Sequence, residues 1–170
     1  MSLQEEIDKT RREIKTDSYS MSIGELISLY EEGDLEINQN SLAFKWSNQR
    51  KSAFIESILM GIPISAILVN QRHDGIWEVI DGLQRLSAIY EFLGILKIEN
   101  SHQYESFTML QDTIYLPSLN GKKWNDENDP ENSLTPTQRL LIKRAKIAVN
   151  IILADNEKMI YELFRRLNSS

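Results

Sequence analysis

The sequence predicts an α/β domain of the α+β type, with a small mixed sheet and flanking helices. Three observations carry this prediction. In several segments, apolar residues repeat at helical spacing between a capping residue and a terminating glycine. Two short apolar runs flank Asp74-Gly75, a dipeptide typical of a β-hairpin turn. The run 147–153 is almost wholly apolar and rich in β-branched residues, as expected of a buried strand.

Each element follows from such a local pattern. Residues 3–16 predict a polar helix with little apolar area to bury, so we assign 1–20 to an N-terminal helical extension and 21–170 to the main domain. The sequence predicts helices at 22–33, 47–61, 83–94, 135–145 and from 156 onward, strands at 35–37, 66–70, 76–80, 113–116 and 147–153, and a polar surface loop at 120–133 anchored by Trp124.

Local signals also indicate how these helices begin and which faces they bury. Capping boxes, Ser22 with Glu25 and Thr135 with Gln138, begin two of them. Two apolar stripes are expected to face inward: Ala53, Phe54, Ile55, Ile58 and Leu59 in one helix, and Met159, Ile160, Leu163, Phe164 and Leu167 in the last.

The composition narrows the classes of function. The chain has 170 residues, no cysteine and two histidines. Disulfides, thiolate catalysis, zinc–thiolate sites and multi-histidine metal centres are therefore excluded within this sequence. No run approaches the roughly 20 apolar residues of a membrane span, and the first residues lack the pattern of a signal peptide. We expect a cytoplasmic protein without a membrane partner.

The charge is unevenly distributed along the chain. The net charge of −6 argues against a generally basic nucleic-acid binder. Residues 139–170, however, carry seven basic and three acidic side chains. Both a local basic face that contacts DNA and an ordinary solvated helix surface fit this pattern.

The main candidate site lies where the strand 76–80 leads through Asp81-Gly82 into a helix. The N-terminus of a helix has unpaired N–H groups and a partial positive charge, and a glycine turn lets an anion approach them. Arg85 is then suited to bind phosphate, Gln84 to hold an oxygen or orient water, and Asp81 to hold Mg²⁺ or act as a base. In the alternative interpretation, Asp81 and Gln84 only form a capping box.

Four motifs in order resemble the Domain of Unknown Function 262 family. They are Phe44-Lys45-Trp46, the segments 54–64 and 77–89, and Leu163-Phe164-Arg165-Arg166-Leu167-Asn168, and the similarity extends over 22–170. This family corresponds to the N-terminal domain of GmrSD-type modification-dependent restriction enzymes and is related to the ParB and sulfiredoxin fold. The resemblance implies a ParB/sulfiredoxin-like domain with a nucleotide pocket, in a system that cuts or nicks modified phage DNA and is driven or regulated by NTP.

The family's central motif is Asp-Gly-Gln-Gln-Arg, which binds NTP and in some members hydrolyses it. This chain matches the motif except at Leu83, where an amide is lost, and it has Ser41-Leu42 where family members have Gln-Arg. The resemblance implies a site for ATP or GTP with Mg²⁺ at Asp81, nucleotide-binding residues Gly82, Leu83, Gln84, Arg85, Arg166 and Asn168, and catalytic residues Asp81, Gln84 and Arg85. Both substitutions remove polar groups from the pocket, so the resemblance supports nucleotide binding more strongly than nucleotide hydrolysis.

Other functions stay open at this point. One is a ParB-like DNA-binding or nuclease module that uses 139–146 and Arg165-Arg166, and another is a catalytically degenerate protein-interaction adaptor. Phe44 and Trp46 either stack on a nucleobase or belong to the edge of the core. Sulfiredoxin chemistry is excluded because it needs a cysteine at Leu83.

The same resemblance bears on the end of the chain. Family members continue beyond the motif that contains Asn168 through a glycine-rich turn into further helices. We therefore expect the domain at 21–170 to be cut short at its C-terminal end, and any contact with DNA to involve a C-terminal region.

Overall fold

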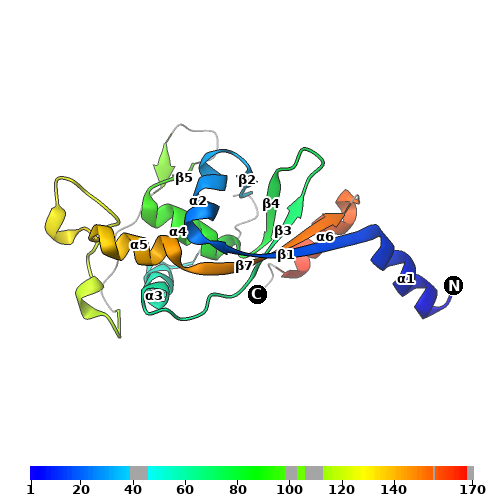
Figure 1. The fold of residues 1–170 in the computed structure, drawn as a ribbon, viewed down its shortest axis with the longest axis horizontal. Coiled ribbons are helices and arrows are strands. Elements are labelled where there is room, and N and C mark those ends of the chain that lie inside the picture. The colour runs from blue at the N-terminus through cyan, green and yellow to red at the C-terminus, as the bar shows by residue number, and fades with distance from the viewer. Residues whose placement is uncertain (39–45, 99–102, 106–112, 155, 168–170) are drawn as a thin grey trace.

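A computed structural model describes residues 1–38, 46–98, 103–105, 113–154 and 156–167 (Figure 1). Its helices are α1 Leu3–Glu13, α2 Ile23–Glu31, α3 Asn48–Leu59, α4 Leu83–Leu93, α5 Pro136–Arg144 and α6 Glu157–Leu167, with short 3₁₀ turns η2 Pro117–Leu119 and η3 Pro130–Asn132. Its strands are β1 Ile14–Ser22, β2 Leu35–Glu36, β3 Ile67–Gln71, β4 Trp77–Asp81, β5 Leu96–Lys97, β6 Tyr104–Glu105 and β7 Lys146–Ala154. The predicted α+β class, with a small mixed sheet and flanking helices, is confirmed.

The main sheet has the strand order β1-β7-β3-β4-β2. β3 and β4 form the predicted antiparallel hairpin, in which Gly75 supplies the turn with a φ of 86°. β7 joins β3 in parallel, β1 pairs with β7 antiparallel, and β2 pairs with β4 in parallel. The hairpin therefore lies inside the sheet, and its second strand leads directly into α4.

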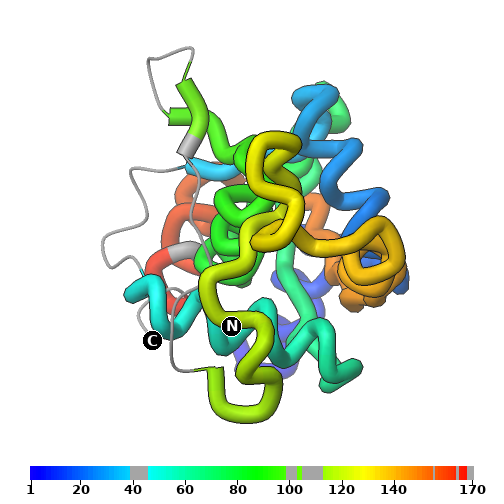
Figure 2. The backbone as a smooth tube through the Cα atoms, turned by 90° about the vertical axis from the view of Figure 1, so that its left-hand side faces the viewer, coloured from blue at the N-terminus to red at the C-terminus, as the bar shows by residue number. Residues whose placement is uncertain are grey.

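The core lies between the sheet and helices α2, α3 and α4, and α4 occupies the middle of the molecule (Figure 2). The rings of Tyr30 and Tyr90 stack at 4.2 Å, and the hydroxyl of Tyr90 donates to the carbonyl of Leu26 at 2.8 Å. Burial raises the pKa of the Tyr90 phenol well above its usual range, so this hydroxyl stays a donor. These contacts fix α4 against α2.

The N-terminal segment differs from its prediction after Glu13. Residues 14–22 form β1 instead of continuing the helix, and they pair along their whole length with β7, from Ile14 opposite Ala154 to Ser22 opposite Lys146. Most β1 side chains are exposed on both faces, so the strand has no apolar alternation that sequence reasoning could detect. The N-terminal extension is therefore helical only through Glu13.

The strand predicted at 113–116 is wrong. The N–H groups of Tyr115 and Leu116 donate to Oε2 of Glu56 at 3.0 and 2.9 Å, and the residues around them form a bend. Glu56 is only 5% exposed, so these two bonds also satisfy a buried carboxylate. The segment is held by a side chain of α3 and not by a neighbouring strand.

Two predicted apolar faces and one predicted strand also need correction. In α3, Ala53 is exposed while Lys51 is buried, because Nζ of Lys51 forms an ion pair with Glu91 at 2.5 Å. In α6, Met159, Ile160 and Leu163 are half-buried, Leu167 is 38% exposed, and the side chain of Phe164 lies outside the described residues. β7 is a strand as predicted, but Lys146, Ala148 and Asn150 are exposed, since part of one sheet face is uncovered.

The polar loop at 120–133 is anchored as predicted. The ring of Trp124 meets that of Phe92 edge to face at 6.0 Å, and Nζ of Lys143 lies 5.8 Å from the Trp124 ring. Nζ of Lys123 pairs with both Asp126 and Asp129 at 3.2 and 3.4 Å. The loop is therefore a compact surface feature attached to α4 and α5.

No α-helix in the described ranges is both long and apolar enough to cross a membrane.

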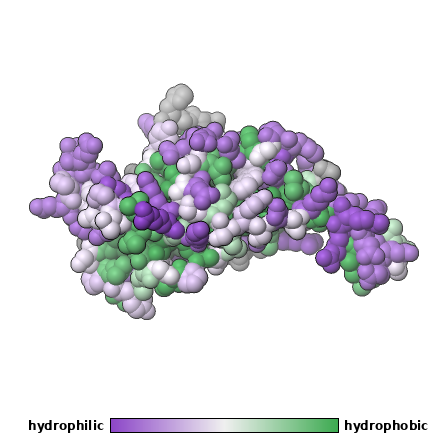
Figure 3. Space-filling view, in the orientation of Figure 1, coloured by the Kyte–Doolittle hydropathy of each residue, from purple (hydrophilic) through white to green (hydrophobic). Residues whose placement is uncertain are grey.

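Deleting residues 1–13 is expected to change the melting temperature by about 2 °C or less, because α1 contributes no buried residue. The helix projects from the body of the molecule, and its visible surface is mainly hydrophilic (Figures 1 and 3). Calorimetric melting of the full and shortened chains measures the difference, and circular dichroism confirms that both are folded. A drop of more than about 5 °C would show that α1 supports the fold.

Candidate functional site at the start of α4

The turn between β4 and α4 requires glycine at position 82. Gly82 has φ 98° and ψ 14°, a left-handed conformation that other residues rarely adopt. A Cβ atom at this position would lie 2.5 Å from Cγ2 of Ile67 and 3.2 Å from Nη2 of Arg85. The backbone of the turn therefore packs directly on β3 on one side and beside the Arg85 guanidinium on the other.

The N-terminus of α4 has no side-chain cap in the described part of the chain. The first bond within the helix runs from the N–H of Leu86 to the carbonyl of Gly82 at 3.0 Å, so the N–H groups of the first turn have no partner inside the helix. The capping-box interpretation of Asp81 and Gln84 is wrong, because Asp81 ends β4 and Gln84 binds elsewhere. Oε1 of Gln84 accepts from the N–H of Trp46 at 3.1 Å.

Arg85 provides a fixed positive charge beside this turn. Its Nη2 donates to the carbonyl of Ala66 at 3.0 Å and lies 3.9 Å from Oδ2 of Asp81. The Arg85 side chain is only 15% exposed. Burial lowers the pKa of the guanidinium and the Asp81 carboxylate raises it, but an arginine remains charged at neutral pH. The bond to Ala66 uses one of its five N–H donors and fixes the direction of the others.

Asp81 is positioned for a different role. Its side chain is 40% exposed and therefore open to solvent at the end of β4. Within the described ranges, no group of three or more His, Asp or Glu side chains is arranged to hold a metal ion. A Mg²⁺ ion at Asp81 would need ligand phosphates and water for most of its coordination shell, as is usual for this ion.

Leu83 contributes to the site only through its backbone. Its side chain is 2% exposed and belongs to the apolar core. The first residue of α4 thus points inward, and its N–H is the group that faces the turn. Leucine in place of the family's glutamine therefore completes the core at this position.

Of the two remaining predicted site residues, the structure describes Arg166, in the last turn of α6. Arg166 lines a hollow of about 440 Å³ between α1 and α6, together with Thr10 and Leu163 and with no residue of the 81–85 turn. Asn168 lies outside the described residues, as do Ser41-Leu42 and Phe44. The structure thus brings together Asp81, Gly82, Gln84 and Arg85.

Sequence reasoning missed the contact between the starts of α3 and α4. The guanidinium carbon of Arg50 lies 4.5 Å from the Trp46 ring centroid, and the Phe54 ring meets Trp46 edge to face at 5.6 Å. Arg50 and Phe54 are four residues apart within the predicted helix 47–61, which would have indicated a shared face, but Trp46 precedes the cap Ser47. The bond from Trp46 to Gln84 depends on packing between segments far apart in the sequence.

Comparison with known proteins places the chain in a family. A family model described as the GmrSD restriction endonuclease, N-terminal domain, matches residues 23–170, which include the turn at Gly82 and the start of α3. Searches among curated proteins and among solved structures found no significant match. The match covers most of the chain, and the chain therefore belongs to the family of GmrSD restriction endonuclease N-terminal domains.

Proposed function

We propose that this domain binds a nucleoside triphosphate at the turn between β4 and α4, as the regulatory domain of a DNA restriction or phage-defence protein. The observation that carries the proposal is the uncapped N-terminus of α4 behind Gly82, with the half-buried cation of Arg85 beside it. Membership of the GmrSD family supports the restriction context. The likeness to ParB and sulfiredoxin domains remains a prediction from the sequence.

Each residue of the turn has a role in this proposal. Gly82 lets phosphate approach the N–H groups of the first turn, and Arg85 binds phosphate oxygens through its remaining donors. Asp81 holds Mg²⁺ bound to the nucleotide, or activates water. Gln84 is oriented by its bond to Trp46, which suits a group that positions water. ATP and GTP are the expected ligands, and hydrolysis is a further step beyond binding.

Isothermal titration calorimetry with ATP, GTP and CTP, each with and without Mg²⁺, tests the proposal. We expect saturable binding at one site, strengthened by Mg²⁺. Arg85→Ala should bind nucleotide more weakly. Its matched control is Arg72→Ala, because Arg72 lies on the β3–β4 hairpin, where it pairs with Glu36 and Asp74 at 2.9 and 3.0 Å. This variant should bind nucleotide as the wild type does. No binding by folded wild type at millimolar nucleotide would reject the proposal.

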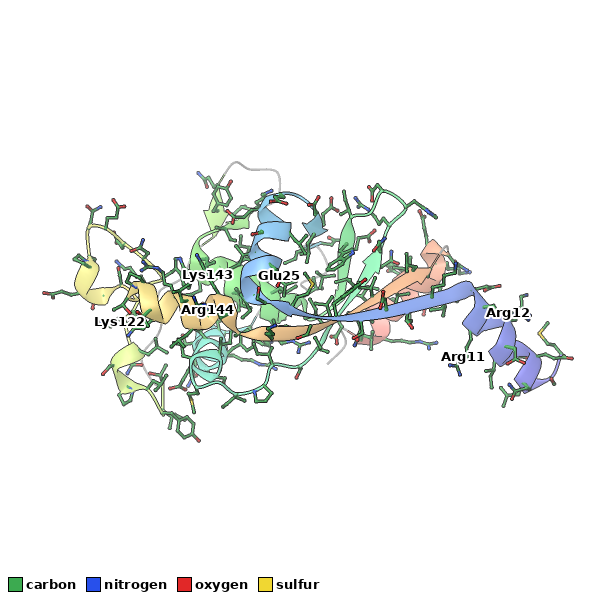
Figure 4. The ribbon with its side chains drawn as sticks, viewed as in Figure 1. Arg11, Arg12, Glu25, Lys122, Lys143 and Arg144 are labelled. Atoms are coloured by element: carbon green, nitrogen blue, oxygen red, sulfur yellow. The ribbon has the colours of Figure 1, made fainter. Side chains whose placement is uncertain are left out.

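One observation favours a second candidate, a DNA-binding module without nucleotide turnover. Lys143 and Arg144 are exposed at the end of α5 (Figure 4). The acidic balance of the chain makes this basic group local. DNA binding that weakens with salt, is lost in Lys143→Glu/Arg144→Glu and persists in Arg85→Ala would support this candidate.

A further inference from the structure

We infer that Trp46 and Arg50 form the nucleobase side of the same site, and that the base inserts between the Trp46 indole and the Arg50 guanidinium. This inference rests on the proposed function and extends it from phosphate to the whole nucleotide. Three sets of contacts support it: those that place Trp46 beside the turn, those that orient its ring, and those that hold Arg50 over it.

The first set places Trp46 next to the first turn of α4. The backbone N–H of Trp46 donates to Oε1 of Gln84 at 3.1 Å. The side chain of Ser47 then caps α3 by accepting from the backbone N–H of Arg50. The N-termini of α3 and α4 therefore meet, and helices α3 and α4 also pack on each other. A ligand whose phosphates lie at Gly82 has Trp46 within the reach of one nucleotide.

The second set fixes the indole. The Phe54 ring meets it at an interplanar angle of 76°, which is an edge-to-face contact. This contact holds the indole against α3. Trp46 is half-buried, so its ring is supported by the protein on one side.

The third set concerns Arg50. Its guanidinium carbon lies 4.5 Å from the centre of the Trp46 ring, and the Arg50 side chain is exposed. No carboxylate of the described residues forms an ion pair with Arg50. A base that enters replaces this cation–π contact with two stacking contacts, since both groups stack readily on nucleobases. The pair therefore offers two planar surfaces between which a purine fits.

The chain contains a matched control for this arrangement. Trp124 has the same pattern of contacts, with Phe92 edge to face at an interplanar angle of 79° and Lys143 over the ring at 5.8 Å. It belongs to the loop 120–133 and has no contact with the turn at Gly82 among those described. Changes at Trp124 should therefore leave nucleotide binding unaltered.

Calorimetry with ATP, GTP and inorganic tripolyphosphate separates the base from the phosphates. We expect Trp46→Ala and Arg50→Ala to weaken ATP and GTP binding by about tenfold or more, and to leave tripolyphosphate binding within about twofold. Trp46→Phe keeps an aromatic face and should retain most of the affinity for ATP and GTP. Trp124→Phe should leave the affinity for all three ligands unchanged. In contrast, Arg85→Ala should weaken the binding of all three ligands.

Fluorine NMR on wild-type protein labelled with 5-fluorotryptophan avoids any effect of the variants on folding. The three tryptophans give three signals, and Trp46→Phe identifies one of them. ATP should shift the Trp46 signal strongly, and tripolyphosphate only weakly. Suppose that ATP binding depends on Arg85, that ATP leaves the Trp46 signal unmoved, and that Trp46→Ala binds ATP as tightly as the wild type. The inference is then wrong and the proposed function stands. If neither ATP nor tripolyphosphate binds, both are wrong.

Discussion

Replacing Gly82 by alanine is expected to destabilise the domain by about 2–5 kcal/mol. Two physical costs add at this position. The φ of 98° is strained for any residue with a side chain. The new Cβ would also stand 2.5 Å from Cγ2 of Ile67, whose own side chain is fully buried in the core, so β3 or α4 must shift.

Urea unfolding of wild type, Gly82→Ala and Gly75→Ala separates these two costs. Gly75 has a similar φ of 86°, but a Cβ there would meet no atom within 4 Å. Its replacement should therefore cost only about 1–2 kcal/mol, from backbone strain alone. Equal losses in the two variants would show that the turn at Gly82 is not closely packed on β3.

Replacing Arg85 by alanine is expected to weaken nucleotide binding by about tenfold to a hundredfold, because a charge-assisted bond to phosphate contributes about 1.5–3 kcal/mol. The guanidinium is half-buried and already fixed by the carbonyl of Ala66, so little side-chain freedom is lost when phosphate binds. Arg85→Lys keeps the charge but not the forked geometry, and should recover only part of the affinity.

Calorimetry of these two variants beside Arg72→Ala measures the effect, and circular dichroism checks the fold of each. Arg72 is also an arginine with carboxylate partners, but it belongs to the hairpin end of β3 and β4. Its replacement should affect stability and leave nucleotide affinity within about twofold. An Arg85→Ala variant that binds nucleotide as tightly as the wild type would remove Arg85 from the site.

The elements that follow from short-range patterns could be predicted from the sequence. The capping boxes at Ser22 and Thr135 form as expected, and the turn at Gly75 joins the predicted hairpin. β1 could not be predicted, because its partner β7 is far away in the sequence and its own side chains are polar on both faces. The bend at Tyr115 likewise depends on a carboxylate from α3.

In the candidate site, too, some features follow from local patterns and others depend on contacts between distant segments. Gly82 and Arg85 follow from a strand that leads through a glycine into a helix, which is a local pattern. The spacing of Asp81 and Gln84 also fits a capping box, and the structure excludes that box because Gln84 is held by Trp46. That bond joins residues 38 positions apart and depends on how α3 packs beside α4. No local pattern specifies it.

Amide chemical shifts in a nitrogen-15 spectrum, recorded while nucleotide and Mg²⁺ are added, test the central claim most directly. The N–H groups of the first turn of α4 are the proposed phosphate ligands, so their signals report binding without any substitution. We predict that the largest shifts occur at Gly82, Leu83, Gln84 and Arg85. Saturable binding that leaves these four signals unmoved and instead shifts those of α5 would contradict the account.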